Sequence, residues 1–264
     1  MAAEVKPYLM TRGWAQQLDY DFLGESPPVF WWHPLAHRGR VVLEQPEIVV
    51  RGGASPAVLV SGVPSIRRDV RSTRIRYTLV VEELTDQPGL VRSLVAMGLD
   101  PEQRERFGAR LDAVFDADTV DGMLAGTVPC EPVAGRLAEL LGAAYATHPE
   151  PSAEAEIDGS WAGPVGGERA RGAFLARIER LAAGEPGLAF SSHALTTVAG
   201  AAQAAAEQPD PCAILLVNGV LTEVEPLRAA PVEPSSESPV DRAQNLVGRL
   251  AEEAARLFRC RRPQ

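Results

Sequence analysis

The sequence predicts an α+β fold: a mainly antiparallel, β-rich N-terminal part covered by helices, a smaller α/β part, and a C-terminal amphipathic helix. Three observations support this. The N-terminal third contains short runs of β-branched residues, the middle third has apolar residues at helical spacing, and the last third alternates the two patterns. With 264 residues and 45% hydrophobic content, the chain can bury a substantial core.

The clearest strand signal starts at Arg74, where apolar residues alternate with polar ones up to Glu82. This alternation predicts a strand with one buried face. Three β-branched runs before it predict further strands, at residues 40–44, 47–51 and 57–61.

Aromatic residues are concentrated at the start of the chain, where residues 1–35 hold three of the four tryptophans. Large rings bury much apolar area, so this segment is expected to pack onto the sheet. The alternative is an exposed recognition surface.

Helical patterns then follow in series. Apolar side chains predict a short helix that Gly98 ends and a longer one at residues 132–147. Between these two, Asp100 is a good N-cap and Pro101 a good first residue for a helix lined by Phe107 and Leu111.

The second half alternates strand and helix signals. Strands are predicted at residues 188–191 and 212–217, with an Ala-rich helix between them that Thr196 or Thr197 caps. Residues 159–167 are expected to form a glycine-rich loop before another helix. Asn218-Gly219 predicts a type I′ hairpin turn, with residues 220–225 as the returning strand.

A connector and a last helix are predicted at the end of the chain. The predicted units are a β-rich unit with a helical layer at 1–147, a smaller α/β unit at 157–227, a flexible connector at 228–238, and an amphipathic helix at 239–262. Whether the first two units share one core is left open. Four apolar residues of the last helix are predicted to contact a partner or the chain's own body: Val247, Leu250, Ala254 and Leu257.

Charge is unevenly distributed. The net charge is −9, yet residues 1–80 carry ten basic and seven acidic side chains. A general nucleic-acid binder is usually basic overall, so nucleic acid is a possible but not a favoured partner. Three dispersed cysteines and no long apolar run predict a cytoplasmic protein without disulfides, structural zinc or a membrane partner.

An arginine cluster precedes and enters the clearest strand. Guanidinium groups pair bidentately with phosphates, so the cluster is a candidate anion site. The alternative is a solvated strand face that pairs with neighbouring carboxylates. The candidate residues are Arg67, Arg68, Arg71, Arg74 and Arg76.

Histidine patterns give weaker signals. His33 and His37 have the i, i+4 spacing of metal ligands and Glu44 is near in sequence, but the glutamate of an HExxH motif is missing, so no metal or cofactor is expected. Ser192 and His193 lie between a predicted strand and a helix, where α/β sheets bind ligands. Neighbours in sequence do not easily face each other as nucleophile and base, and no G-x-S-x-G elbow is present.

Acidic residues crowd one helix end, at Asp112, Asp116, Asp118 and Asp121. They lack the spacing of a calcium loop, and capping explains residues such as Asp118 better.

Three functional hypotheses follow. The leading one is a non-catalytic interaction or regulatory protein within a bacterial cytoplasmic multi-protein assembly, with another protein as partner. The alternatives are an anion or nucleic-acid binding module that uses the arginine cluster, and a hydrolase with a site near Ser191 to His193. No convincing catalytic constellation is found in the sequence, so a non-enzyme is favoured.

Overall fold

The computed structural model describes residues 5–15, 18–129, 133–144 and 157–227. These residues fold into a mixed α+β structure around one nine-stranded sheet, as the sequence predicts. The predicted C-terminal helix lies outside the described residues. None of the described helices combines the length and hydrophobicity needed to cross a bilayer.

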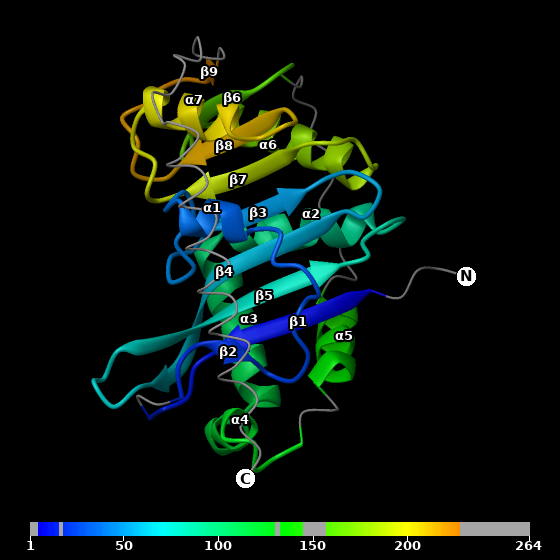
Figure 1. Cartoon of the computed structure of the whole chain (residues 1–264), viewed down its shortest axis with the longest axis vertical. Coiled ribbons are helices and arrows are strands. Elements are labelled where there is room, and N and C mark those ends of the chain that lie inside the picture. The colour runs from blue at the N-terminus through cyan, green and yellow to red at the C-terminus, as the bar shows by residue number, and fades with distance from the viewer. Residues whose placement is uncertain (1–4, 16–17, 130–132, 145–156, 228–264) are drawn as a thin grey trace, which may run out of the picture. The chain divides into compact units, whose positions relative to one another are not determined.

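The strand order in the sheet is β2-β1-β5-β4-β3-β7-β8-β6-β9 (Figure 1). The strands are β1 Lys6–Thr11, β2 Asp21–Phe22, β3 Ile48–Arg51, β4 Ala57–Arg68, β5 Arg74–Glu82, β6 Trp161–Pro164, β7 Leu188–Ser192, β8 Cys212–Leu216 and β9 Glu225–Pro226.

The sheet joins an antiparallel part to a parallel part. All pairs among β1 to β5 are antiparallel, whereas β7, β8 and β6 run parallel. The junction is the antiparallel pair of β3 with β7, in which Val49 lies opposite Phe190. The sheet and its buried residues are therefore continuous through both halves of the described chain.

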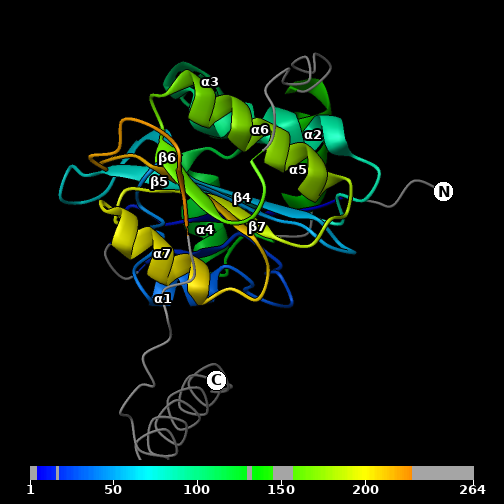
Figure 2. The same ribbon diagram turned by 90° about the horizontal axis from the view of Figure 1, so that it is seen from above.

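Helices cover both faces of the sheet (Figure 2). On one face lie α2, α3, α5 and α6, and on the other lie α1 and α7. The helices are α1 His33–His37, α2 Pro88–Leu99, α3 Pro101–Val114, α4 Ala117–Leu124, α5 Val133–Ala144, α6 Glu168–Ala182 and α7 Val198–Ala206.

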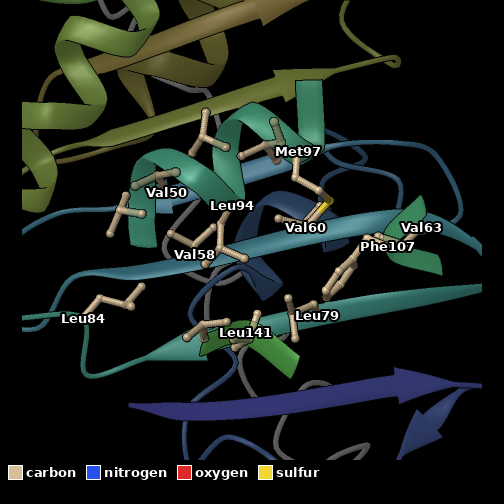
Figure 3. Packing of buried hydrophobic residues seen from close by; sticks show 14 of the residues in the cluster. Val50, Val58, Val60, Val63, Leu79, Leu84, Leu94, Met97, Phe107 and Leu141 are labelled. Atoms are coloured by element: carbon tan, nitrogen blue, oxygen red, sulfur yellow. The ribbon is translucent and has the colours of Figure 1, made fainter. Parts of the chain in front are cut away.

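Packing on the first face is driven by aliphatic side chains. Figure 3 shows Leu94 and Met97 of α2 and Phe107 of α3 beside Val60 of β4 and Leu79 of β5. Each is buried, and full burial of such a side chain contributes about 1.5–3 kcal/mol.

Packing on the second face of the sheet explains why β5 departs from its predicted alternation of buried and exposed residues. The alternation of β5 predicts a polar face for Thr78 and Glu82, but both are buried. Val80 of the same face packs in the second core cluster with Trp32 and Leu35, the latter from α1. The central part of β5 is therefore buried on both faces.

Capping residues set two helix starts as the sequence predicts. The Asp100 carboxylate accepts hydrogen bonds from the N–H groups of Glu102 and Gln103, with Pro101 in the first turn. The Thr197 hydroxyl accepts the N–H of Gly200 and begins α7. The first cap lowers the pKa of Asp100, because the N–H of Gln103 stabilises its ionised form.

The strand predicted at residues 40–44 is wrong. This segment forms turns, in which Gln45 N–H donates to the Val42 carbonyl and Val42 N–H donates to the Glu47 carboxylate. Each long side of β3 is already paired, with β4 and with β7, so residues 40–44 have no strand partner there.

Two predictions in the second half are also wrong. Residues 159–167 contain β6, whose Trp161 is fully buried and which pairs in parallel with β8. The predicted hairpin at Asn218-Gly219 does not form. Both edges of β8 already pair with β7 and β6, so the chain after β8 cannot pair with it. The next strand, β9, pairs with β6 instead. Neither Asn218 nor Gly219 has positive φ.

Gly108 on α3 allows a close approach of helix to strand. A Cβ atom at this position would overlap the Pro64 carbonyl oxygen of β4. We expect Gly108→Ala to lower the free energy of unfolding by about 1–3 kcal/mol, because the helix must move away from the backbone. Urea denaturation measures the change.

Gly135→Ala is the matched control, since this glycine lies within α5 and its Cβ would meet no atom within 4 Å. Helix propensity predicts a gain of about 0.5–1 kcal/mol for the control. Equal effects of the two substitutions would contradict the close packing of α3 on β4.

Candidate functional site

The arginine cluster lies at the end of the β4–β5 hairpin, which extends beyond the end of β1 (Figure 1). Arg67 and Arg68 end β4, Arg71 lies in the turn, and Arg74 and Arg76 begin β5. The hairpin brings all five to one end of the sheet, as a strand–turn–strand sequence must. Their side chains have different environments.

Arg67 is a buried structural residue. Its side chain is 8% exposed, and its Nε lies 3.8 Å from the carboxylate of Asp112 on α3. Its guanidinium donates to the Thr11 hydroxyl and the Arg12 carbonyl and lies 5.0 Å from the centre of the Tyr77 ring. These contacts engage much of its hydrogen-bonding capacity.

Tyr77 and Asp112 complete this buried network. The Tyr77 hydroxyl donates to the Asp112 carboxylate at 3.0 Å, and burial raises the pKa of Tyr77, so the phenol keeps its proton. The same carboxylate accepts the Ser65 hydroxyl and the N–H of Ile66. The network ties α3 to the edge of the hairpin.

Two further arginines are also paired within the protein. Arg74 forms a bidentate pair with Glu105, at 2.9 and 2.7 Å, and lowers the pKa of that carboxyl. Arg76 donates to the Gly62 carbonyl. The cluster is thus not one open row of guanidinium groups.

The turn itself is organised by Asp69. Its carboxylate accepts the N–H groups of Arg71 and Thr73 and lies 3.5 Å from the Arg12 guanidinium. Burial acts to raise the pKa of Asp69, but these N–H groups and the guanidinium outweigh it and hold the pKa below its usual value. Arg68 donates to the Ser72 carbonyl across the turn.

A pocket of about 400 Å³ lies beside the turn end of the hairpin. It is within the size range of small-ligand sites. Its lining combines one aromatic and two aliphatic side chains with two cationic and two anionic ones: Trp14, Ile75, Ala117, Arg67, Arg68, Asp118 and Asp121.

Trp14 is held in place although its side chain is exposed. Its backbone N–H donates to the Asp121 carboxylate at 3.0 Å, and its backbone carbonyl accepts the N–H of Val70 at 3.1 Å. The Trp14 residue nevertheless remains 58% exposed. The preceding Gly13 fits closely, since a Cβ there would lie 2.7 Å from Asp121 Oδ1.

The pocket also includes the first turn of α4. The N-cap of this helix is Asp116, whose carboxylate accepts the N–H and hydroxyl of Thr119. These bonds lower the pKa of Asp116. The sequence assigned a capping role to Asp118, which lies instead inside the helix and lines the pocket.

The Ser191–His193 segment forms a second cluster of polar groups, at the end of β7. The Ser191 hydroxyl accepts the N–H of Ile48. The Ser192 hydroxyl donates to the Arg40 carbonyl at 2.6 Å and accepts the N–H groups of Ala194 and Leu195. Both hydroxyls therefore form hydrogen bonds with backbone groups.

A buried carboxylate, Glu47, lies next to this segment and was not found by sequence reasoning. Its two oxygens accept the N–H groups of Val42 and His193, at 2.6 and 2.7 Å. The His193 Nδ1 atom lies 3.5 Å from Glu47 Oε1 without a hydrogen bond. Glu47 thus fastens the chain before β3 to the chain after β7.

The histidine pair forms as its spacing predicts. His33 and His37 lie on the short helix α1, with ring centres 5.6 Å apart, and both are exposed. Among the described residues, no three His, Cys, Asp or Glu side chains gather closely enough to hold a metal ion.

The aromatic N-terminal segment is partly packed and partly exposed. Trp32 is buried and contacts Phe30 and Trp31, while the Arg51 guanidinium lies 5.0 Å from the centre of the Trp31 ring. Trp14 belongs to the same segment but lies at the hairpin. The packed interpretation therefore holds for Trp32 and not for Trp14.

The predicted contact residues of the terminal helix, Val247, Leu250, Ala254 and Leu257, lie outside the described residues. Comparison of the chain with protein-family models, with curated proteins and with solved structures finds no match.

The sequence predicts the arginine cluster but not the pocket. Its residues come from four separate segments, around Trp14, Arg67, Ile75 and Asp118, and no spacing links them. One available signal was a tryptophan that follows a glycine outside any apolar run.

Proposed function

We propose that this chain is a non-catalytic interaction protein that works in a cytoplasmic multi-protein assembly and binds its partner with the hairpin end. By hairpin end we mean residues 66–76 together with Trp14 and the first turn of α4. The observation that carries this proposal is the exposed Trp14, held by both backbone groups beside a pocket. Tryptophan is enriched among the residues that dominate binding energy at protein interfaces.

Other exposed apolar side chains at this end support the proposal. Ile66 is 74% exposed and Val70 is 44% exposed, although both are large β-branched residues. Exposed apolar groups that are rimmed by charged residues are typical of interaction sites. Arg68, Arg71 and Asp118 supply such a rim.

The polar groups near Ser191 favour this proposal over hydrolysis. A nucleophilic serine needs a hydroxyl hydrogen-bonded to a base. The Ser192 hydroxyl instead donates to the Arg40 carbonyl, and Glu47 holds two backbone N–H groups.

Affinity purification of the tagged full-length protein from its host tests the proposal. The baits are the wild type, a Trp14→Ala/Val70→Ser variant and a Val220→Ser control, since Val220 is 84% exposed but lies outside the hairpin end. Thermal unfolding establishes that all three are folded. We expect the wild type and the control to recover the same stoichiometric protein, which the double variant recovers about tenfold less or weaker still.

Equal recovery by all three baits would contradict the proposed surface. Recovery of no stoichiometric protein by any bait would contradict the proposed function. Nucleic acid in the eluate that disappears at high salt would favour the alternative of an anion-binding module.

A further inference from the structure

We propose that the pocket beside Trp14 receives an arginine or lysine side chain of the partner protein, stacked on the Trp14 indole and paired with the Asp118 carboxylate. This inference rests on the proposed function, because it names the chemistry with which the hairpin end recognises its partner. Trp14 and Asp118 both line the pocket, together with Ile75 and Ala117.

The walls fit a long basic side chain. Arginine and lysine have an aliphatic stem and a charged head, and such side chains place the stem on apolar surface. Ala117 and the Trp14 ring offer that surface within a volume of about 400 Å³, which the largely buried Ile75 also lines. The quadrupole of an aromatic ring attracts a cation that lies over its face.

The charges of the pocket favour a cation once internal pairs are considered. Arg67 is compensated by Asp112, and its guanidinium donates to Ser65, Thr11 and Arg12. Among the residues that the structure describes, Arg68 is then the one lining cation without a carboxylate partner, and the pocket also holds the carboxylates of Asp118 and Asp121. Within the described chain, the Asp118 carboxylate has no hydrogen bond or ion pair.

An anion is disfavoured by the same groups. A free helix N-terminus attracts anions, but the Asp116 carboxylate already occupies the N-terminus of α4. An incoming phosphate or carboxylate would also approach Asp118 and Asp121. Arg68 is the single lining guanidinium that is not engaged with a carboxylate.

The backbone that carries the Trp14 ring is fixed before binding. The backbone of Trp14 is bonded to Asp121 on one side and to Val70 on the other. Gly13 permits this contact because a side chain there would overlap Asp121. Preorganised groups lose less conformational freedom on binding, which raises affinity for the same contacts.

Titration with capped tripeptides tests the inference. The probes are acetyl-Gly-Arg-Gly-amide, acetyl-Gly-Lys-Gly-amide, acetyl-Gly-Glu-Gly-amide and inorganic phosphate, added to the full chain at low salt. The readout is the NMR signal of the Trp14 indole N–H, assigned with a Trp14→Phe variant. We expect the Arg and Lys peptides to shift this signal in a saturable way, and the Glu peptide and phosphate to leave it unchanged.

Substitutions give the residue-level test. Asp118→Asn should weaken binding of the Arg peptide about two- to fivefold, Trp14→Ala by a similar factor measured on neighbouring amide signals, and the double variant about tenfold or more. Asp210→Asn is the matched control, because Asp210 is exposed and outside the pocket, and it should bind the Arg peptide like the wild type.

The two proposals fail in different ways. If the Glu peptide or phosphate binds and Arg68→Ala abolishes that binding, the pocket is an anion site and the inference is overturned. If no peptide binds, or if Asp118→Asn binds the Arg peptide as the wild type does, the inference also fails. Partner recovery that still depends on Trp14 and Val70 would then leave the proposed function standing.

Discussion

Replacement of either member of the buried Arg67–Asp112 pair is expected to lower the free energy of unfolding by about 3–5 kcal/mol. The side chains are 8% and 5% exposed, so each substitution leaves an uncompensated charge in a poorly solvated site. In Arg67→Met the Asp112 carboxylate keeps only its hydrogen bonds from Ser65, Ile66 and Tyr77. Urea denaturation at neutral pH measures the loss.

A double-mutant cycle identifies the cause of this loss. Arg67→Met combined with Asp112→Asn should cost clearly less than the sum of the single substitutions, because the combined variant carries no unpaired buried charge. Arg106→Ala is the control, since Arg106 and Glu102 form a pair on α3 that is 72% and 80% exposed. It should change stability by less than about 0.5 kcal/mol. Additive effects of the two buried substitutions would argue against the pair.

Glu47→Ala is expected to cost about 2–4 kcal/mol. The substitution removes the acceptor of the Val42 and His193 N–H groups, and an unsatisfied buried donor costs about 1–3 kcal/mol. The effect should concentrate where β3 meets β7. Hydrogen exchange at the Val42 and His193 amides, together with urea denaturation, measures it.

His193→Ala separates this structural role from a catalytic one. The backbone N–H of residue 193 still reaches Glu47 in this variant, so stability should fall by about 1 kcal/mol or less. If Glu47→Ala proved as stable as the wild type, the buried carboxylate would not fasten the two segments. Hydrolytic activity that depends on His193 would reopen the alternative of an enzyme.

Local patterns allowed most of the elements to be predicted. The alternation in β5, the Asp100-Pro101 start of α3 and the Thr197 cap of α7 depend on neighbours in sequence, so they are readable without tertiary structure. The failures at residues 40–44 and 218–219 have a common cause. A strand forms only where a neighbouring strand has an unpaired edge. Both edges of β3 and both edges of β8 are already paired.

The candidate site was predicted only in part for the same reason. The arginines are close in sequence, so their gathering at one hairpin follows directly from the strand–turn–strand pattern. The pairing of these arginines with carboxylates does not follow from that pattern. Glu105 and Asp112 come from a helix about 30 to 45 residues further along the chain. The sequence therefore could not distinguish a paired arginine from an open one.

By itself, then, the sequence determined the α+β class, the main helices and the hairpin that carries the arginine cluster. These follow from periodicity, capping and turn residues, which act over a few residues. Only the tertiary structure decided that one sheet unites both halves, that Arg67 is buried, and that Trp14 borders a pocket with Asp118. Long-range packing sets these features, because burial and charge pairing depend on segments that the fold alone brings together.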